Sequence, residues 1–254
     1  MLEELYISLT AKTVPGAREV GLVRELAGIA GRHRRQKRAW AAHLQHTKEF
    51  ITAHLHEAEA AEPVLVLGAG LCLDLPLDAL DAHLAGALLV DAVLPRRTAA
   101  LLKRYENIDF ELADATGFIA EFTAADDPYG LTPPQVAPVP LAGYGLAVSA
   151  NILSQLALPF ASSPPLNDAE NELTIRLQKA HIRALMAMGC PALLITDYER
   201  VEQHGDNNHV IKSVDTSLLP GEPLEKWQWH IAPEGEVERG RAVTLNVGAW
   251  LVGK

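Results

Sequence analysis

The pattern of hydrophobic and polar residues changes near residue 60 of this chain. In residues 1–60 the apolar positions recur every three or four residues, which is the period of a helix that buries one face. Pro15 is a suitable helix start, and we expect Gly31 to break or bend the first helix. A second helix carries an apolar stripe that must bury against the rest of the protein: Trp40, Leu44, Thr47, Ile51 and Leu55. The pattern therefore predicts an N-terminal helical segment over residues 1–60.

From residue 61 onward, short apolar runs alternate with helical segments. Such alternation predicts parallel strands in one sheet with helices on both of its faces. We expect strands at residues 64–67, 87–90, 108–112, 144–149 and 192–196, and helices near residues 74–85, 95–104, 116–122 and 168–188. Residues 61–254 are thus predicted to form one α/β domain.

The C-terminal end departs from this alternation. Residues 226–233 and 241–252 are both strand-like, and a short polar connection separates them in place of a helix. Two such runs predict an antiparallel hairpin at the edge of a mostly parallel sheet. The polar, turn-rich residues 203–221 follow the fifth strand and are predicted to form a lid or substrate loop. The proline-rich residues 126–141 are predicted to form an extended surface loop.

The overall charge limits the partners that the protein can have. The net charge is −10 and the isoelectric point is near 5.4, which argues against broad binding to nucleic acid or to an anionic membrane. No apolar run reaches the roughly 18 residues that a membrane span needs, and the acidic N-terminus lacks the basic segment of a secretory signal. Because Cys72 and Cys190 both lie in apolar surroundings, we expect buried free thiols in a soluble, cytoplasmic protein.

One segment, residues 32–38, is strongly basic in spite of the negative total. It reads RHRRQKR, and on a helix Arg34 and Arg38 share one face while Arg32 and Arg35 share another. The default interpretation is a solvated basic face that pairs with an acidic body. The functional alternative is a site for an anionic small-molecule substrate near Arg34, Arg35 and Arg38.

The stretch from Pro63 to Asp91 carries the clearest functional pattern. An apolar run ends at Gly68 and Gly70, a helical segment follows, and a second apolar run ends on Asp91. This is the layout of a nucleotide-binding βαβ unit, in which glycine lets a ligand approach the backbone and the acidic side chain accepts hydrogen bonds from ribose hydroxyls. A dinucleotide-binding loop needs a third glycine, and Leu73 stands in its place, which favours a ligand without a pyrophosphate.

These motifs resemble those of the class I S-adenosylmethionine-dependent methyltransferases. VLVLGAG resembles their first motif, and Asp91 stands where the family has an acidic residue that binds the ribose. Asp114, in FELADATGF, stands where the family has an acidic residue beside the adenine. GYGLAVSANILSQL resembles the fourth strand and the loop after it, and the predicted C-terminal hairpin agrees with that fold. The resemblance covers about residues 60–254 and implies a three-layer Rossmann-like fold, a seven-stranded sheet and S-adenosyl-L-methionine as the cofactor. The cofactor-binding residues that it implies are Gly68, Ala69, Gly70, Asp91, Ala92, Asp114, Ala115 and Asn151.

Two positions depart from the family pattern at the end of the site that holds the methionine part of the cofactor. Val66 stands where the family often has an acidic residue, and Cys72 stands where it usually has a third glycine. Asp74 is the candidate for the missing polarity. A purely structural interpretation also stays open, because the two glycines can form a plain strand–helix turn and Asp91 and Asp114 can cap helices.

Methyl transfer from a sulfonium is an in-line displacement that needs the accepting atom close to the methyl carbon. Asn151 follows the fourth predicted strand, and Asp197 and Tyr198 follow the fifth. We predict that Asn151 orients a substrate and that Asp197 or Tyr198 acts as a base or hydrogen-bonding partner; the alternative is that they cap helices or solvate a loop. We expect no metal site, because no cysteine or acidic residue lies at ligand spacing from His43, His46 and His54.

The sequence therefore predicts methyl transfer from S-adenosylmethionine to an unidentified small-molecule acceptor. We expect the N-terminal helical segment to cover or frame the mouth of the active site. The first rival is a non-catalytic protein that binds S-adenosylmethionine or another nucleotide on the same fold. The second is an enzyme that uses this fold for other chemistry, such as aminopropyl transfer or a nicotinamide-dependent reaction. The acceptor and the oligomeric state, a homodimer included, stay open.

Overall fold

The computed structural model describes residues 2–133, 142–161 and 166–253, so much of the proline-rich stretch 126–141 lies outside the described residues. The helices are α1 (Leu2–Thr10), α2 (Leu22–His54), α3 (Leu77–Asp81), α4 (Arg96–Leu102), α5 (Ile119–Ala124) and α6 (Asp168–Met186). The strands are β1 (Lys12–Thr13), β2 (Val64–Leu67), β3 (Ala87–Asp91), β4 (Val93–Leu94), β5 (Ile108–Leu112), β6 (Leu146–Ala150), β7 (Ala192–His204), β8 (Asn207–Lys212), β9 (Glu225–Ala232) and β10 (Arg241–Val252).

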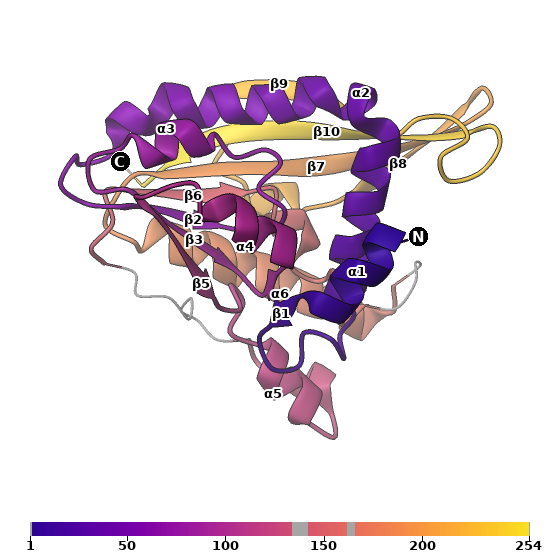
Figure 1. Cartoon of the computed structure of the whole chain (residues 1–254). Helices are drawn as coiled ribbons and strands as arrows, with labels where there is room; N and C mark the ends of the chain where they lie inside the picture. Colours follow the sequence, from indigo (N-terminus) through magenta and orange to yellow (C-terminus); the bar gives the residue numbers. More distant parts are fainter. Residues whose placement is uncertain (1, 134–141, 162–165, 254) are drawn as a thin grey trace.

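The centre of the molecule is a mixed sheet with the strand order β5-β3-β2-β6-β7-β10-β9 (Figure 1). β2, β3, β5, β6 and β7 run parallel, and β10 is antiparallel to both of its neighbours. Every residue of β2 and of β6 is buried, because strands of a parallel sheet are covered on both faces. The predicted three-layer Rossmann-like fold, with its closing antiparallel hairpin, is confirmed by this order.

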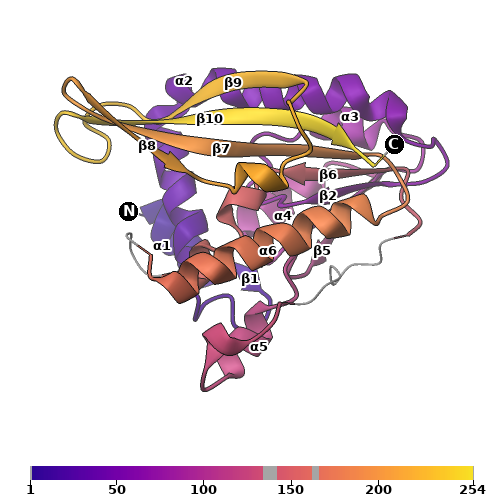
Figure 2. The same ribbon diagram turned by 180° about the vertical axis from the view of Figure 1, so that it is seen from behind.

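Helices form the two outer layers. Trp40 and Phe50 of α2 pack on the same face of the sheet as Val66, whereas Leu173 of α6 packs on the face that bears Leu65. Neighbouring side chains of a strand point to opposite faces, so β2 contributes to both cores. Figure 1 shows α2 running along β9, with α3 and α4 on the near side, and Figure 2 shows α6 crossing the other side.

The N-terminal helices differ from the prediction in their boundaries. α2 spans 33 residues as two helical segments joined at a kink, which agrees with the two helices expected, and it begins after the turn that contains Pro15. It bends at Gln36, whose φ of −109° and ψ of 24° are not helical, and not at Gly31 (Figure 1). Gly31 lies beside α1, and a Cβ there would require the carboxylate end of the Glu4 side chain to shift. None of the helices in the described part of the chain is long and apolar enough to cross a membrane.

The region after the fifth parallel strand also corrects the prediction. β7 continues past residue 196 to His204, and β8 pairs antiparallel with it, so residues 207–212 are strand and not the predicted lid or substrate loop. The reason lies in β10, which pairs with β7 from Ala192 to His204 and supplies hydrogen-bond partners far beyond the parallel part of the sheet. β8 adds a strand that the seven-stranded prediction lacks.

Candidate functional site

The glycine turn after β2 opens at the carboxyl edge of the parallel strands. Gly68 has a φ of 84° and Gly70 a φ of 50°, which are left-handed conformations that glycine adopts without steric penalty. A Cβ at Gly68 would stand 2.9 Å from Cβ of Ile152 and 3.0 Å from the carbonyl oxygen of Ala150. The chain after β6 therefore lies directly against this turn, and the two segments form the floor of a site.

Asp91, at the end of β3, is held beside the glycine turn. Its Oδ2 accepts a hydrogen bond from the backbone N–H of Gly70 at 2.7 Å, and its Oδ1 accepts one from Val93 N–H at 3.0 Å. Burial raises the pKa of Asp91 to about 6, although these backbone donors act in the opposite direction. Because a carboxylate oxygen can accept two hydrogen bonds, each oxygen keeps capacity for a ligand donor.

Asp114 follows β5 and holds the start of α5. Its Oδ1 accepts hydrogen bonds from the backbone N–H and the hydroxyl of Thr116, at 2.8 and 2.7 Å. Its Oδ2 accepts from the N–H groups of Phe118 and Ile119, both at 2.8 Å. These four hydrogen bonds occupy the acceptor positions of the carboxylate, so Asp114 caps the start of α5 in the structure. Its contact with an adenine stays a prediction.

Asn151 and Asp74 form a polar pair on the other side of the glycine turn. Asn151 has a φ of 52° directly after β6, and its Nδ2 donates to Oδ2 of Asp74 at 2.7 Å. Burial raises the pKa of Asp74, and the hydrogen bond from Asn151 counteracts this. The Oδ1 of Asn151 is buried and has no hydrogen-bond partner among the described residues. The pair thus places the Asp74 carboxylate on the cavity wall, with its orientation fixed by Asn151.

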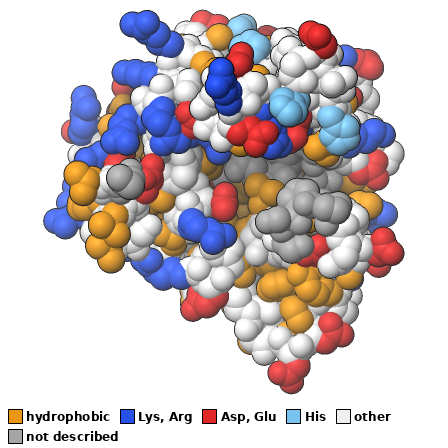
Figure 3. Space-filling view, turned by 90° about the vertical axis from the view of Figure 1, so that its right-hand side faces the viewer, with side chains coloured by type: hydrophobic (Ala, Val, Ile, Leu, Met, Phe, Trp, Pro, Cys, Tyr) orange, Lys and Arg blue, Asp and Glu red, His pale blue; other side chains and the backbone are white. Residues whose placement is uncertain are grey.

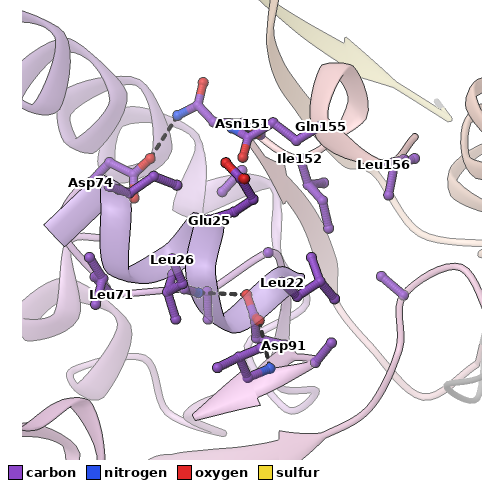
Figure 4. A pocket seen from close by; sticks show the side chains of 18 of the residues that line it. Leu22, Glu25, Leu26, Leu71, Asp74, Asp91, Asn151, Ile152, Gln155 and Leu156 are labelled. Atoms are coloured by element: carbon purple, nitrogen blue, oxygen red, sulfur yellow. Dashed lines mark hydrogen bonds between the residues drawn. The ribbon is translucent and has the colours of Figure 1, made fainter. Parts of the chain in front are cut away.

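These groups line one cavity of about 190 Å³ (Figure 4). Every residue predicted to bind the cofactor lies on its wall: Gly68, Ala69, Gly70, Asp91, Ala92, Asp114, Ala115 and Asn151. The charged residues in the described part of the wall are all acidic, namely Glu25, Asp74, Asp91 and Asp114. A ligand in this cavity therefore meets a negative field.

The first half of α2 lines the cavity, as expected of an N-terminal helical segment that covers or frames the mouth of the site. Leu22, Leu26 and Ile29 line it, and Figure 4 shows the side chain of Glu25 extending from α2 toward it. The sequence did not indicate which of its side chains do so, because periodicity alone does not tell which surface a helix covers.

Three ring-bearing side chains and a leucine line another part of the cavity, which we call the indole compartment: Trp40, His43 and Leu44 of α2, and Trp229 of β9. His43 stacks on Trp229 with ring centroids 3.9 Å apart, and its Nδ1 accepts from Nε1 of Trp227 at 3.0 Å. Burial lowers the pKa of His43 to about 3, so the ring is neutral at ordinary pH. The buried Nε1 of Trp229 has no partner among the described residues. Nothing in the sequence pattern indicated this compartment.

Two predicted catalytic residues lie away from the described wall of the cavity. The Asp197 carboxylate accepts a hydrogen bond from the Ser154 hydroxyl, and the Tyr198 ring contacts Trp250 with centroids 6.5 Å apart. Their catalytic roles stay predictions. Of the three predicted positions, only Asn151 is brought together with the glycine turn.

The basic residues of α2 are also outside the described wall of the cavity. Arg35 pairs with Glu236 at 2.6 Å and with Glu4 at 3.5 Å, and Arg34 lies 4.0 Å from Glu3. Figure 3 shows Lys and Arg side chains gathered to one side of a hollow in this face. These pairs agree with the default interpretation of a solvated basic face against an acidic body.

Among known proteins, the matches to this chain are all solved structures. No protein-family model matches the chain, and no curated protein matches it. The chain is similar to the 1,6-didemethyltoxoflavin N1-methyltransferase of Burkholderia thailandensis, which was solved with 1,6-didemethyltoxoflavin and S-adenosylhomocysteine bound. The two chains are 14% identical, and the TM-score is 0.45 over 94% of this chain and 92% of that chain. It is also similar to the glycopeptide N-methyltransferase MtfA in complex with sinefungin, at 14% identity and a TM-score of 0.33 over 80% of this chain and 93% of that chain.

Proposed function

We propose that the cavity binds S-adenosyl-L-methionine and that the protein transfers its methyl group to a small-molecule acceptor. The observation that carries this proposal is the charge of the described wall, which holds Glu25, Asp74, Asp91 and Asp114 and neither Lys nor Arg. S-adenosylmethionine has positive sulfonium and ammonium groups and no phosphate, so this wall attracts it. The same carboxylates repel the pyrophosphate of a nicotinamide dinucleotide.

The chain's own residues fit the parts of this cofactor. The oxygens of Asp91, oriented by the N–H groups of Gly70 and Val93, can accept hydrogen bonds from the two ribose hydroxyls. The carboxylate of Asp74, held by the Nδ2 of Asn151, is an acceptor suited to the ammonium of the methionine end. Asp74 thereby replaces the acidic residue that the family often has at the position of Val66.

When bound, the cofactor supplies an activated methyl group on a sulfonium, which passes to the acceptor by in-line displacement and leaves S-adenosylhomocysteine. The protein's contribution is to hold the reacting groups in line and to exclude water. Asn151 lines the same cavity as the glycine turn and the indole compartment, which suits the role of orienting an acceptor. Leu22, Leu26 and Ile29 cover the cavity with apolar side chains that keep water out.

Calorimetric titration with S-adenosylhomocysteine, S-adenosylmethionine and NAD tests the ligand class. We expect the first two to bind and NAD not to bind. Asp91→Asn should weaken S-adenosylhomocysteine at least about tenfold, because it removes a charged hydrogen-bond acceptor. Asp109→Asn is the matched control, since Asp109 is an exposed residue of the neighbouring strand β5. Binding of NAD alone, or equal affinity in both variants, would reject the proposal.

A second experiment separates an enzyme from a binding protein. The wild-type protein is incubated with a small-molecule extract and S-adenosylmethionine that carries a labelled methyl group. Transfer of the label to an extract component, lost in Asp91→Asn and retained in Asp109→Asn, is the result expected of an enzyme. Binding without label transfer would support the non-catalytic alternative.

A further inference from the structure

The N-terminal helix α1 leaves an apolar stripe open to solvent. Leu2 is 84% exposed, Leu5 56% and Leu9 73%. Their spacing of three and four residues places them on one face of the helix together with Tyr6. The opposite face is covered, because Ile7 is buried in the apolar cluster that α1 forms with α2.

This concentration of exposed apolar side chains is peculiar to α1. Within residues 2–133, 142–161 and 166–253, no other helix or strand carries more than two exposed large hydrophobic side chains. Single exposed apolar residues are normal on a protein surface, whereas a contiguous group of them marks an interaction site. The stripe of α1 is therefore a candidate docking surface.

Cationic side chains contact α1 beside the stripe. Glu3 lies 2.5 Å from Arg97 and 4.0 Å from Arg34 in its ion pairs. The guanidinium of Arg97 also stands over the ring of Tyr6, 5.8 Å from its centroid. The guanidinium of Arg18 donates two hydrogen bonds, each of 2.7 Å, to backbone carbonyl oxygens at the C-terminal end of α1. Figure 3, which faces the α1 side of the molecule, shows hydrophobic side chains bordered by Lys and Arg.

The charge that this surface presents outward is positive. The side chains of Arg34 and Arg97 are 56% and 67% exposed. The two acidic side chains of α1, Glu3 and Glu4, are turned toward arginines and are only 20% and 28% exposed. The cations that contact α1 or follow it directly outnumber these two carboxylates: Lys12, Arg18, Arg34, Arg35 and Arg97.

An apolar stripe with a cationic rim fits an anionic lipid surface. The apolar side chains of an interfacial helix lie at the boundary between headgroups and acyl chains, and Lys or Arg beside them meets the anionic headgroups. The net charge of −10 argues against broad binding to such a surface. At a Debye length of about 8 Å, however, the charges next to the contact decide the attraction, and those next to α1 are mostly cationic. A second copy of the chain fits less well, because a two-fold contact through α1 would oppose two cationic rims.

We propose that α1 and the cations beside it form a docking surface for a membrane that carries anionic lipids. Leu2, Leu5 and Leu9 enter the interface, and Arg34 and Arg97 stay at the level of the headgroups. The inference goes beyond the proposed function and does not rest on it. Because α1 packs on the half of α2 that lines the cavity, the docked protein holds its candidate site close to the lipid.

Co-sedimentation of the whole chain with lipid vesicles tests this proposal. One set of vesicles is phosphatidylcholine alone, and the other contains about 30% phosphatidylserine. We expect binding at least about tenfold tighter to the anionic vesicles. Raising the salt to about 1 M, where the Debye length is about 3 Å, should weaken that binding. Equal binding to both sets of vesicles, or binding to neither, would overturn the proposal.

Variants at exposed positions locate the surface without disturbing the fold. Leu5→Gln with Leu9→Gln removes apolar side chains at constant charge and should weaken binding to the anionic vesicles at least about tenfold. Leu84→Gln with Leu224→Gln is the matched control, because these leucines are 81% and 60% exposed and lie outside α1. The control should bind as the wild type does. Arg34→Gln should weaken binding about fivefold, the effect of one cation near the surface. Unchanged binding in the α1 double variant would refute the assignment.

Self-association through the stripe is the competing outcome. Size-exclusion chromatography with light scattering gives the mass of the wild type and of the Leu5→Gln and Leu9→Gln double variant. We expect the same mass for both, because the stripe serves lipid and not a second copy. A wild-type dimer that becomes a monomer in the double variant would assign the stripe to self-association and refute the membrane surface.

Discussion

The turn after β2 makes a prediction that needs no ligand. Alanine at Gly68 would meet two penalties, because φ is +84° and its Cβ would stand 2.9 Å from Cβ of Ile152 and 3.0 Å from the carbonyl oxygen of Ala150. A left-handed backbone costs a non-glycine residue about 1–2 kcal/mol. Overpacking in a rigid environment costs about 1–3 kcal/mol more. Gly68→Ala should therefore lower the free energy of unfolding by about 2–5 kcal/mol, a large share of the total for a typical domain.

A second glycine separates the two penalties. Gly189 has a φ of +74°, and no described atom lies within 4 Å of the place where its Cβ would stand. Gly189→Ala should therefore show the backbone penalty alone, about 1–2 kcal/mol. Urea unfolding followed by circular dichroism measures both variants, with equal slopes indicating that the unfolded state is unchanged. If the two variants are equally destabilised, the close contact between the glycine turn and the segment after β6 is refuted.

Three further predictions concern charged groups. Because the pKa of Asp91 rises from 3.8 to about 6 on folding, protonation of Asp91 stabilises the folded protein most below pH 3.8, and this stabilisation is lost as the pH rises through 6. At about 1.4 kcal/mol per pKa unit, the stabilisation amounts to about 3 kcal/mol. Asp91→Asn should remove this contribution from the difference between the free energies of unfolding that urea titration gives at pH 4 and at pH 7. Asp74→Asn should weaken S-adenosylhomocysteine about tenfold in calorimetry and leave 5′-methylthioadenosine unchanged, whereas the exposed Asp78→Asn should affect neither; equal weakening of both ligands would contradict the assignment of Asp74 to the ammonium. Arg35→Gln should reduce the free energy of unfolding by about 1–3 kcal/mol, because it leaves the Glu236 carboxylate, whose side chain is 6% exposed, without its charged donor. Ligand binding should stay unchanged, and a large binding defect would restore the anionic-substrate hypothesis.

Some features of the site follow from short stretches of sequence. The run Val64–Leu67 is short, wholly apolar and followed by glycine, and it forms the strand β2 with the predicted bounds. Asp91 was placed at the end of its strand by the same reasoning, and it lies beside Gly70. Such predictions succeed because strand burial, tight turns and strand ends depend on residues that are near one another in the chain.

Other features depend on contacts that no local pattern contains. Gly31 was expected to bend a helix, but it lies beside α1, and the bend occurs at Gln36, whose side chain donates to Glu236 at 2.8 Å. The strand β7 was expected to end near residue 196, but its pairing with β10 extends it to His204. In both cases the deciding partner is a distant segment of the chain.

The sequence by itself determined the α/β class, the parallel strands, the closing hairpin and the edge at which the glycine turn and Asp91 meet, because periodicity and turn residues act locally. Only the tertiary structure decided which residues of α2 line the cavity, that Asp74 pairs with Asn151, and that the charged residues of the described cavity wall are acidic. It also decided that His43 and Trp227, which are 184 positions apart in the chain, meet beside an unpaired Trp229. The physical reason is that the hydrogen-bond partner and the burial of a side chain depend on which distant surfaces pack together.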